Sequence, residues 1–248
     1  SILTNLFEQL DRNTTHQVIR PVQIETLTEL DKQLTHHDIV LKVSTGAGKT
    51  VVGLVYAEMM RRRYSGEPVL FLCPTKQLVS QVVETAGKIG ISAESFQNDT
   101  DPYRAFHGRT ILVFTYDKVF TARNIFERRD ILPSTIVFDD IHSGVEKIRQ
   151  KYTVRVPTKA YDRIRQIFQP LCEASDPSVW RGIGNNDASA RFDVPYWAWI
   201  PQASTVSEII EKLKDEDDVR FSWPNISRYI DQIRLCISGS DAELSLSV

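Results

Sequence analysis

The chain has 248 residues, a formal net charge of −2, 42% apolar and 25% charged residues. These values are typical of a soluble globular protein and exclude a protein whose whole surface is basic enough to grip nucleic acid. No apolar run approaches the roughly 18 residues of a membrane-spanning helix, and the first residues do not form a signal peptide. We therefore expect a cytoplasmic protein with no membrane segment, and nucleic-acid binding only through a local patch or a partner domain.

Helical and strand-like patterns alternate through residues 22–142. The expected helices cover residues 22–34, 50–63, 76–88 and 116–128. The expected strands cover residues 39–43, 69–73, 110–115 and 135–138. These strands are nearly continuous apolar runs, as in strands buried on both faces, and the alternation predicts an α/β fold with a mainly parallel sheet between helices. Ligands of such sheets bind at the carboxyl ends of the strands.

Residues 44–50 read STGAGKT and join an expected strand to an expected helix. Gly46 and Gly48 allow the backbone to turn tightly, so that its N–H groups can converge on a phosphate. The N-terminus of the following helix favours negative charge there. Lys49 can reach the β- and γ-phosphates of a nucleotide, and the Thr50 hydroxyl can hold Mg²⁺. The alternative is a plain glycine turn between a strand and a helix.

The end of that helix carries Arg61, Arg62 and Arg63. We interpret them as a solvated helix end that the helix dipole favours. The three cysteines, Cys73, Cys172 and Cys236, are too far apart for a metal motif or a disulfide framework, which suits a reducing compartment.

The strand at 135–138 is followed by two carboxylates and a histidine, Asp139, Asp140 and His142. Phosphoryl transfer with Mg²⁺ needs an acidic residue that positions the metal, and hydrolysis needs a group that orients the attacking water. The alternative role of such acidic residues is to cap the next helix.

After His142 the pattern changes, and residues 144–232 are expected to be mainly helical. A final apolar run at 233–238 is expected to return as a strand to the parallel sheet. We therefore expect one domain over residues 1–248, with 144–232 inserted in it as a helical module, because a structureless loop of that length is rare in a compact domain. The aromatic stretch at 196–199 is interpreted as core or partner contact rather than as a base-stacking surface.

Together these segments resemble the first RecA-like motor domain of superfamily 2 helicases and translocases (DEAD/DEAH-box-like). The segment at 74–81 matches the Pro-Thr-x-x-Leu-x-x-Gln of that superfamily, and 45–50 matches its Thr-Gly-x-Gly-Lys-Thr. Asp139 to His142 look like a variant of Asp-Glu-x-Asp/His, and Arg20 to Gln23 resemble Arg-x-x-Gln. The segment at 114–118 is similar to Thr-x-Glu-Lys, and Ser238 could stand in a Ser-Ala-Thr motif linked to His142.

The resemblance implies ATP and Mg²⁺ as cofactors, DNA or RNA as a partner, and a second RecA-like domain of the same protein that supplies an arginine finger. It implies nucleotide binding by Gln23, Thr45, Gly46, Ala47, Gly48, Lys49 and Thr50. It implies catalytic roles for Lys49, Asp139, Asp140 and His142, with Thr50 and Asp139 at the metal. It implies nucleic-acid contacts by Pro74, Thr75, Lys76, Thr115 and Lys118. Residues 144–232 are a possible surface for a protein partner.

Two positions depart from common patterns. Val43 stands where the full P-loop pattern has glycine, although superfamily 2 often lacks that glycine. Asp140 stands where the family has a water-orienting glutamate, and its side chain is one methylene shorter. The alternatives are therefore a degenerate helicase-like domain that serves as a nucleotide-binding scaffold, or another P-loop enzyme. The guanine-reading Asn-Lys-x-Asp of GTPases is absent from the sequence.

Overall fold

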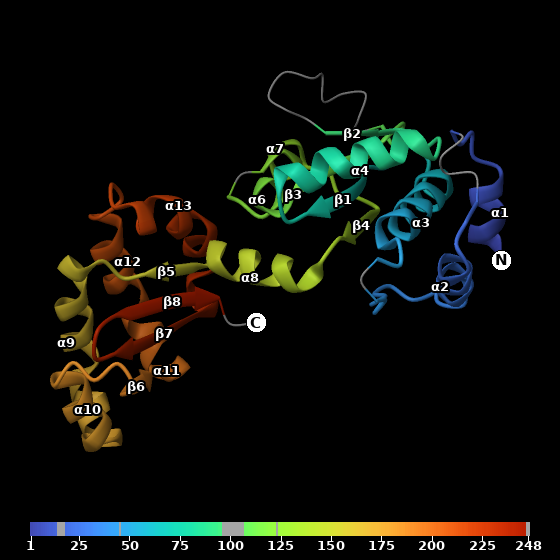
Figure 1. Ribbon diagram of the computed structural model, residues 1–248. Coiled ribbons are helices and arrows are strands. Elements are labelled where there is room, and N and C mark those ends of the chain that lie inside the picture. The colour runs from blue at the N-terminus through green and yellow to red at the C-terminus, as the bar shows by residue number, and fades with distance from the viewer. Residues whose placement is uncertain (14–17, 45, 96–106, 123, 247–248) are drawn as a thin grey trace. The chain divides into compact units, whose positions relative to one another are not determined.

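The computed structural model describes residues 1–13, 18–44, 46–95, 107–122 and 124–246. The chain divides into two compact units, Ser1–Val145 and Glu146–Val248. Each unit has its own sheet and its own apolar core (Figure 1). No helix in the described part of the chain is long and apolar enough to cross a membrane.

The first unit is built on a four-stranded parallel sheet with the order β2-β3-β1-β4. Its strands are β1 (Val69–Cys73), β2 (Ala93–Glu94), β3 (Ile111–Thr115) and β4 (Thr135–Phe138). β1 and β3 are buried almost throughout, which explains their continuous apolar sequence. Cys73 pairs with Thr115, and Leu72 pairs with Phe138, so that the carboxyl ends of three strands meet at one edge. The predicted α/β fold with a parallel sheet is confirmed.

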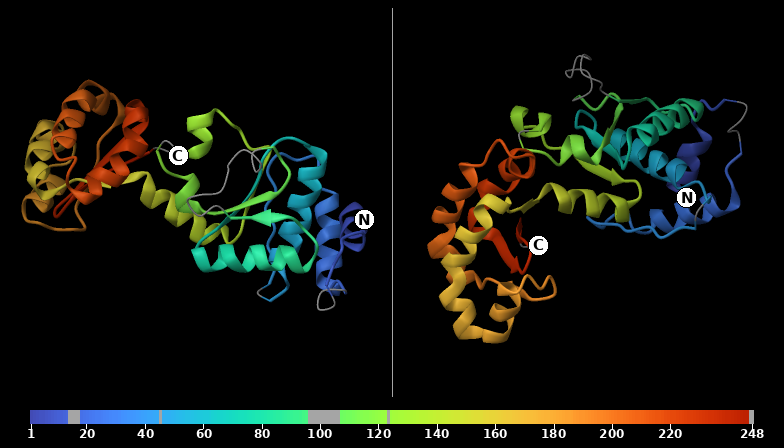
Figure 2. Two further views of the ribbon diagram at one scale, coloured as in Figure 1. Left: turned by 90° about the horizontal axis from the view of Figure 1, so that it is seen from above. Right: turned by 60° about the vertical axis from the view of Figure 1, so that its left-hand side comes forward.

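Helices lie alongside this sheet in Figure 1 and in the turned views of Figure 2. They are α1 (Ile2–Glu8), α2 (Pro21–Asp31), α3 (Lys49–Arg63), α4 (Lys76–Lys88), α6 (Tyr116–Val119), α7 (Ile125–Arg129) and α8 (Ile141–Lys151), which ends in the second unit. Of these, α3 and α4 pack against Val69, Phe71 and Val113 on one face of the sheet, and α1 and α2 pack on α3. On the other face, Phe126 of α7 meets Phe114 edge to face, with ring centroids 6.0 Å apart. The sheet is therefore covered on both faces.

The strand expected at residues 39–43 is not formed, so this prediction is wrong. Val40 is 86% exposed, and a pocket of about 800 Å³ lies between residues 36–41 and β4. Among the described strands, β4 pairs with β1 alone. Residues 39–43 therefore have no neighbouring strand to complete their backbone hydrogen bonds, although their composition suits a strand.

The second unit contains an antiparallel sheet with the order β5-β8-β7-β6. Its strands are β5 (Thr153–Arg155), β6 (Arg191–Asp193), β7 (Ile233–Ser238) and β8 (Ala242–Leu246). The strand expected at 233–238 exists as β7, but it pairs with β6 and β8 and does not return to the parallel sheet. Its sequence explains this pairing, because buried Ile233, Leu235 and Ile237 alternate with the exposed Arg234 and the half-buried Cys236.

Helices make up most of residues 144–232, and the short strands β5 and β6 were not anticipated there. The helices are α9 (Thr158–Ser175), α10 (Pro177–Gly184), α11 (Tyr196–Trp199), α12 (Ala203–Glu211) and α13 (Asp217–Ile226), with 3₁₀ turns η2 (Ile200–Gln202) and η3 (Ser227–Gln232). Trp199 is fully buried, and its indole N–H donates to the carbonyl of Ile230 at 2.8 Å, whereas Trp197 is 67% exposed. Trp199 is thus a packing anchor of this unit.

Candidate nucleotide and nucleic-acid site

The loop before α3 turns through two left-handed glycines. Gly46 and Gly48 both have a φ of 81°, a conformation that side chains with a Cβ rarely adopt. Gly48 is the N-cap of α3, and Lys49 and Thr50 form its first turn. The first N–H groups of a helix have no partner within it, and a glycine N-cap supplies no side-chain acceptor. Ala47 is buried and Lys49 is exposed; Thr45 lies outside the described residues.

Gln23 packs directly on this loop. A Cβ added to Gly48 would lie 2.1 Å from Nε2 of Gln23, so only glycine permits this approach. Nε2 of Gln23 donates to the carbonyl of Gly48 at 3.4 Å, and its Oε1 accepts the backbone N–H of Arg20 at 2.9 Å. The Arg20 guanidinium donates to the carbonyl of Gly46 at 3.1 Å. The structure thus brings the Arg-x-x-Gln segment and the glycine loop together.

Asp139 follows β4, and its N–H donates to the carbonyl of Leu72 at 2.9 Å, which extends the sheet by one bond. Burial and the neighbouring charge of Asp140 raise the pKa of Asp139, while the charge of Lys49 and a hydrogen bond from the Asp140 backbone oppose the rise. The loop lysine and the strand-end carboxylate are therefore close enough to interact. A hydroxyl on Thr50 and a carboxylate on Asp139 are oxygen ligands that suit Mg²⁺ beside nucleotide phosphates.

Asp140 adopts a left-handed backbone conformation with a φ of 53°. Its carboxylate accepts a hydrogen bond from the Ser143 hydroxyl at 2.6 Å, and its carbonyl accepts the N–H of Gly144 at 3.1 Å. Both contacts tie Asp140 to the first turn of α8, as a helix cap would. His142 is exposed in the same turn. Ser238 belongs to the other unit, so its expected link to His142 stays a prediction.

Tyr116, which had no predicted role, also lies at this edge of the sheet. Tyr116 follows Thr115 at the end of β3, is 1% exposed, and donates its hydroxyl to the carbonyl of Asp139 at 2.8 Å. Burial, and then the charge of Asp139, raise the pKa of Tyr116 well above its ordinary value. Burial and Asp139 also raise the pKa of the Cys73 thiol to about 12. In the sequence, Tyr116 stood out only by its place directly after a buried strand and within the segment 114–118.

The residues predicted to contact nucleic acid lie at the ends of β1 and β3. Pro74 is buried, whereas Thr75 and Lys76 are exposed. The Thr75 hydroxyl accepts the N–H of Leu78 at 3.2 Å and so caps α4. Burial, and then the charge of Lys76, lower the pKa of Lys118. Two lysines from different strand ends thus lie close together, beside the half-buried Thr115.

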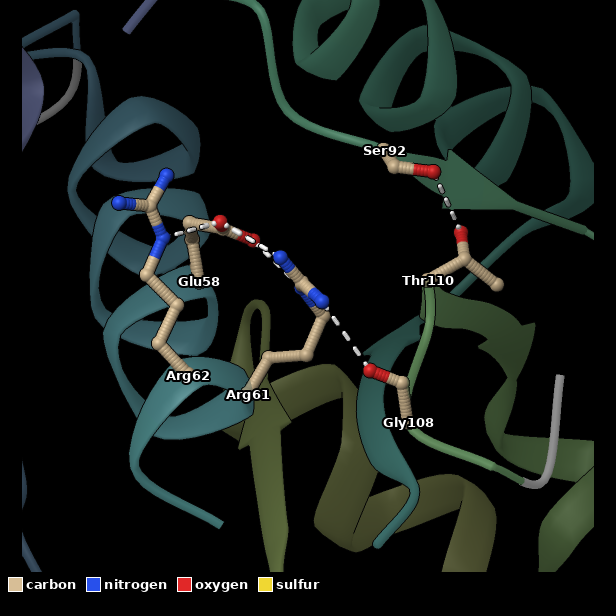
Figure 3. A network of polar contacts seen from close by, with 6 residues as sticks. All are labelled: Glu58, Arg61, Arg62, Ser92, Gly108 and Thr110. Atoms are coloured by element: carbon tan, nitrogen blue, oxygen red, sulfur yellow. Dashed lines mark hydrogen bonds and ion pairs between the residues drawn. The ribbon is translucent and has the colours of Figure 1, made fainter. Parts of the chain in front are cut away.

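We expected the arginines at the end of α3 to be simply solvated, and they are not. Figure 3 shows Arg61 and Arg62 converging on Glu58, which is 3% exposed. Nε of each arginine lies 2.7 Å from a Glu58 carboxylate oxygen, and Arg61 also donates to the carbonyl of Gly108 at 3.1 Å. This cluster joins α3 to the segment before β3, so the arginine charges interact with groups inside the first unit.

A protein-family model described as type III restriction enzyme, res subunit (ResIII), matches residues 16–173. No curated protein matches the chain. The matched region contains the glycine loop, the parallel sheet and the acidic strand end. The matched domain is the helicase-type RecA-like N-terminal domain of superfamily 2 helicases, which confirms the resemblance drawn from the sequence. The chain therefore belongs to the ResIII family and carries a helicase-like ATP-dependent motor domain.

Proposed function

We propose that this chain is the N-terminal motor domain of an ATP-dependent superfamily 2 helicase or translocase of the cytoplasm. It binds ATP with Mg²⁺ at the glycine loop and contacts the backbone of DNA or RNA at the ends of β1 and β3. A second RecA-like domain of the same protein completes the ATP site with an arginine finger. Residues 144–232 offer a surface for a protein partner.

The main support for the proposal is that Asp139 ends β4 beside β1 and that the charge of Lys49, from the glycine loop, acts on it at the carboxyl edge of a parallel sheet. Such an edge is where α/β proteins bind nucleotides. Lys76 and Lys118 add a local pair of positive charges at the ends of β1 and β3. The net charge of −2 makes such a local pair necessary, because the surface as a whole does not attract phosphate.

Each predicted site residue has a role in this proposal. The loop residues Thr45, Gly46, Ala47, Gly48 and Lys49 hold the phosphates of ATP through backbone N–H groups and the lysine charge. Thr50 and, through water, Asp139 hold Mg²⁺, which neutralises phosphate charge when bound. Asp140 orients the attacking water, and Gln23 recognises the adenine base. His142 transmits changes in the ATP site to the rest of the motor. Pro74 shapes the loop that presents Thr75 and Lys76 to the nucleic-acid backbone. Thr115 and Lys118 make further contacts with that backbone.

Nucleotide binding tests the first half of the proposal. Lys49→Ala removes the phosphate lysine and is expected to weaken binding of a fluorescent ATP analogue with Mg²⁺ about tenfold or more, because a charge-assisted contact of about 1.5–3 kcal/mol is lost. Lys32→Ala is the matched control, since Lys32 is an exposed lysine that pairs with Glu29 in the same unit. Equal affinity of the Lys49→Ala variant and the wild type contradicts the proposed site. Preference for GTP over ATP favours a different P-loop enzyme.

Salt dependence of nucleic-acid binding tests the second half. The Lys76→Ala/Lys118→Ala double variant is expected to weaken binding of single-stranded DNA and RNA alike and to lower the slope of log K against log salt by about 2. A Lys32→Ala/Lys88→Ala variant removes two surface lysines that pair within α2 and α4 and serves as the control. An unchanged slope in the first variant rules out these lysines as phosphate contacts.

One observation favours a second candidate, a nucleotide-binding scaffold without strong hydrolysis. The Asp140 carboxylate accepts a hydrogen bond from the Ser143 hydroxyl at 2.6 Å, a contact that suits a helix cap. Steady-state ATP hydrolysis by the protein with both motor domains separates the two functions. Loss of hydrolysis in Asp140→Asn supports the motor, whereas a wild-type rate no higher than that of Lys49→Ala supports the scaffold.

A further inference from the structure

Tyr116 connects the two halves of the proposed site. It is the first residue of α6, directly after Thr115 at the carboxyl end of β3, and its hydroxyl donates to the carbonyl oxygen of Asp139 at 2.8 Å. The strand order places β1 between β3 and β4, so this side chain reaches across the end of β1 to the acidic end of β4. A single hydrogen bond thereby joins the predicted nucleic-acid segment to the predicted metal ligand.

The ring of Tyr116 is held on several sides. It stacks on Phe138 with centroids 5.9 Å apart and on Phe120 with centroids 6.4 Å apart. A Cβ added to Gly144 would lie 2.3 Å from Cζ and 2.6 Å from the hydroxyl oxygen of Tyr116. Glycine inside α8 is unfavourable for the helix, yet only glycine leaves room for this ring. Ring packing on these sides therefore directs the Tyr116 hydroxyl toward the carbonyl of Asp139.

The peptide that Tyr116 holds is the one between the two carboxylates. Asp140 has a φ of 53°, which is unfavourable for a residue with a side chain and persists only when the surroundings enforce it. Ser143 and Gly144 hold Asp140 from within the same helix start. The bond from Tyr116 comes from a different strand end, so a shift of β3 or α6 changes the orientation of this peptide directly.

We propose that Tyr116 is a positioning residue that couples nucleic-acid contact at Thr115 and Lys118 to the orientation of Asp139 and Asp140. Nucleic acid bound at the end of β3 shifts the start of α6, and the Tyr116 hydroxyl passes this shift to the Asp139–Asp140 peptide. The inference rests on the proposed function, because it needs both ATP hydrolysis and nucleic-acid binding. Tyr116 contacts neither ligand itself.

Tyr116→Phe tests the inference, because it removes the hydroxyl and keeps the stacked ring. In the protein with both motor domains, steady-state ATP hydrolysis is measured without and with single-stranded DNA or RNA. The ratio of stimulated to basal kcat is expected to fall about fivefold, which corresponds to one hydrogen bond of about 1 kcal/mol. The KM for ATP and the Kd for nucleic acid are expected to stay unchanged. A purely structural role lowers both rates in proportion and leaves their ratio unaltered.

Ser134→Ala is the matched control, since the hydroxyl of Ser134 also donates to a backbone carbonyl, that of Pro68 at 3.2 Å, before the amino ends of β4 and β1. Its stimulation ratio is expected to equal that of the wild type. Gly144→Ala displaces the Tyr116 ring and is expected to lower the ratio at least as much as Tyr116→Phe. An active, stimulated wild type with an unchanged ratio in Tyr116→Phe overturns this inference alone. A wild type without stimulated hydrolysis overturns it together with the proposed function.

Discussion

The two units of the chain use their polar side chains differently. In the first unit, Lys49 and Asp139 lie at one edge of a parallel sheet, with Lys76 and Lys118 at neighbouring strand ends. In the second unit, buried Asn225 donates to the carbonyl of Lys151 at 2.8 Å, and buried Ser238 donates to Asp241 within the turn between β7 and β8. These two buried side chains donate to backbone carbonyls of their own unit, those of Lys151 and Asp241.

Strand direction explains this difference. The carboxyl ends of parallel strands gather at one edge, so residues that follow separate strands become neighbours. Antiparallel strands alternate in direction, so the segments after them are divided between the two ends of the sheet. The first unit therefore concentrates chemistry-bearing residues at one edge of its sheet, whereas the second unit is organised around an apolar core. Substitutions at four residues test this difference between the units.

The largest expected effect is on the apolar core of the second unit. Trp199→Ala is expected to lower the free energy of unfolding by about 3–5 kcal/mol, because a fully buried indole is lost. All four tryptophans lie in this unit, so intrinsic tryptophan fluorescence in a urea titration reports on it alone. Nucleotide binding by the first unit is expected to persist.

Trp197→Ala is the control for this prediction, since Trp197 is 67% exposed and its loss is expected to cost much less. Loss of nucleotide binding in Trp199→Ala at the urea concentration that unfolds the second unit contradicts the independence of the two units.

The next effect concerns the carboxyl edge of the first unit. Asp139→Asn keeps the shape of the side chain and removes the charge. It is expected to reduce the Mg²⁺-dependent gain in ATP-analogue affinity about tenfold to a hundredfold, as for residues that hold a metal through water. Isothermal titration with and without Mg²⁺ measures this gain. Asp130→Asn, at an exposed aspartate elsewhere in the same unit, is expected to change nothing.

Glu58 is a buried charged residue of the first unit. Burial alone would raise the pKa of Glu58, but hydrogen bonds from Arg61 and Arg62, and then their charges, outweigh burial and lower the pKa. Ionised Glu58 therefore stabilises the fold above its unfolded pKa of about 4.3, and this contribution is lost as the pH falls through the lower folded value.

Glu58→Gln is thus expected to cost about 1–2 kcal/mol at neutral pH, with a difference from the wild type that shrinks in acid. Urea unfolding at a series of pH values, followed by circular dichroism, measures it. Glu29→Gln breaks an exposed pair with Lys32 and is expected to cost less than about 0.5 kcal/mol. A pH-independent difference for Glu58→Gln contradicts the assigned charge.

The smallest expected effect on stability concerns Thr75, which has two candidate roles, as a helix cap and as a nucleic-acid contact. Its hydroxyl caps α4, so Thr75→Ala is expected to cost about 1 kcal/mol. Aspartate caps a helix as well as threonine but repels phosphate. Thr75→Asp is therefore expected to keep wild-type thermal stability and to weaken nucleic-acid binding, measured by fluorescence anisotropy. If Thr75→Asp binds nucleic acid as the wild type does, Thr75 is a helix cap only.

Much of the first unit followed from the sequence alone. The buried strands β1 and β3 were readable because a strand covered on both faces needs an unbroken apolar run. The motor-domain family was readable because short motifs at strand ends report local chemistry. The place of Asp139 beside the end of β1 also followed, since parallel strands bring their carboxyl ends together.

Only the tertiary structure decided which segments pair and which side chains cross between elements. Residues 39–43 have the composition of a strand but lack a neighbouring strand, while β7 pairs within the second unit. The Tyr116 bond to Asp139 and the Glu58 cluster join segments that are far apart in sequence or face one another only after folding. Local patterns indicate which secondary structure a segment favours, whereas its partners, and for residues 39–43 the strand itself, depend on long-range packing that no single segment encodes.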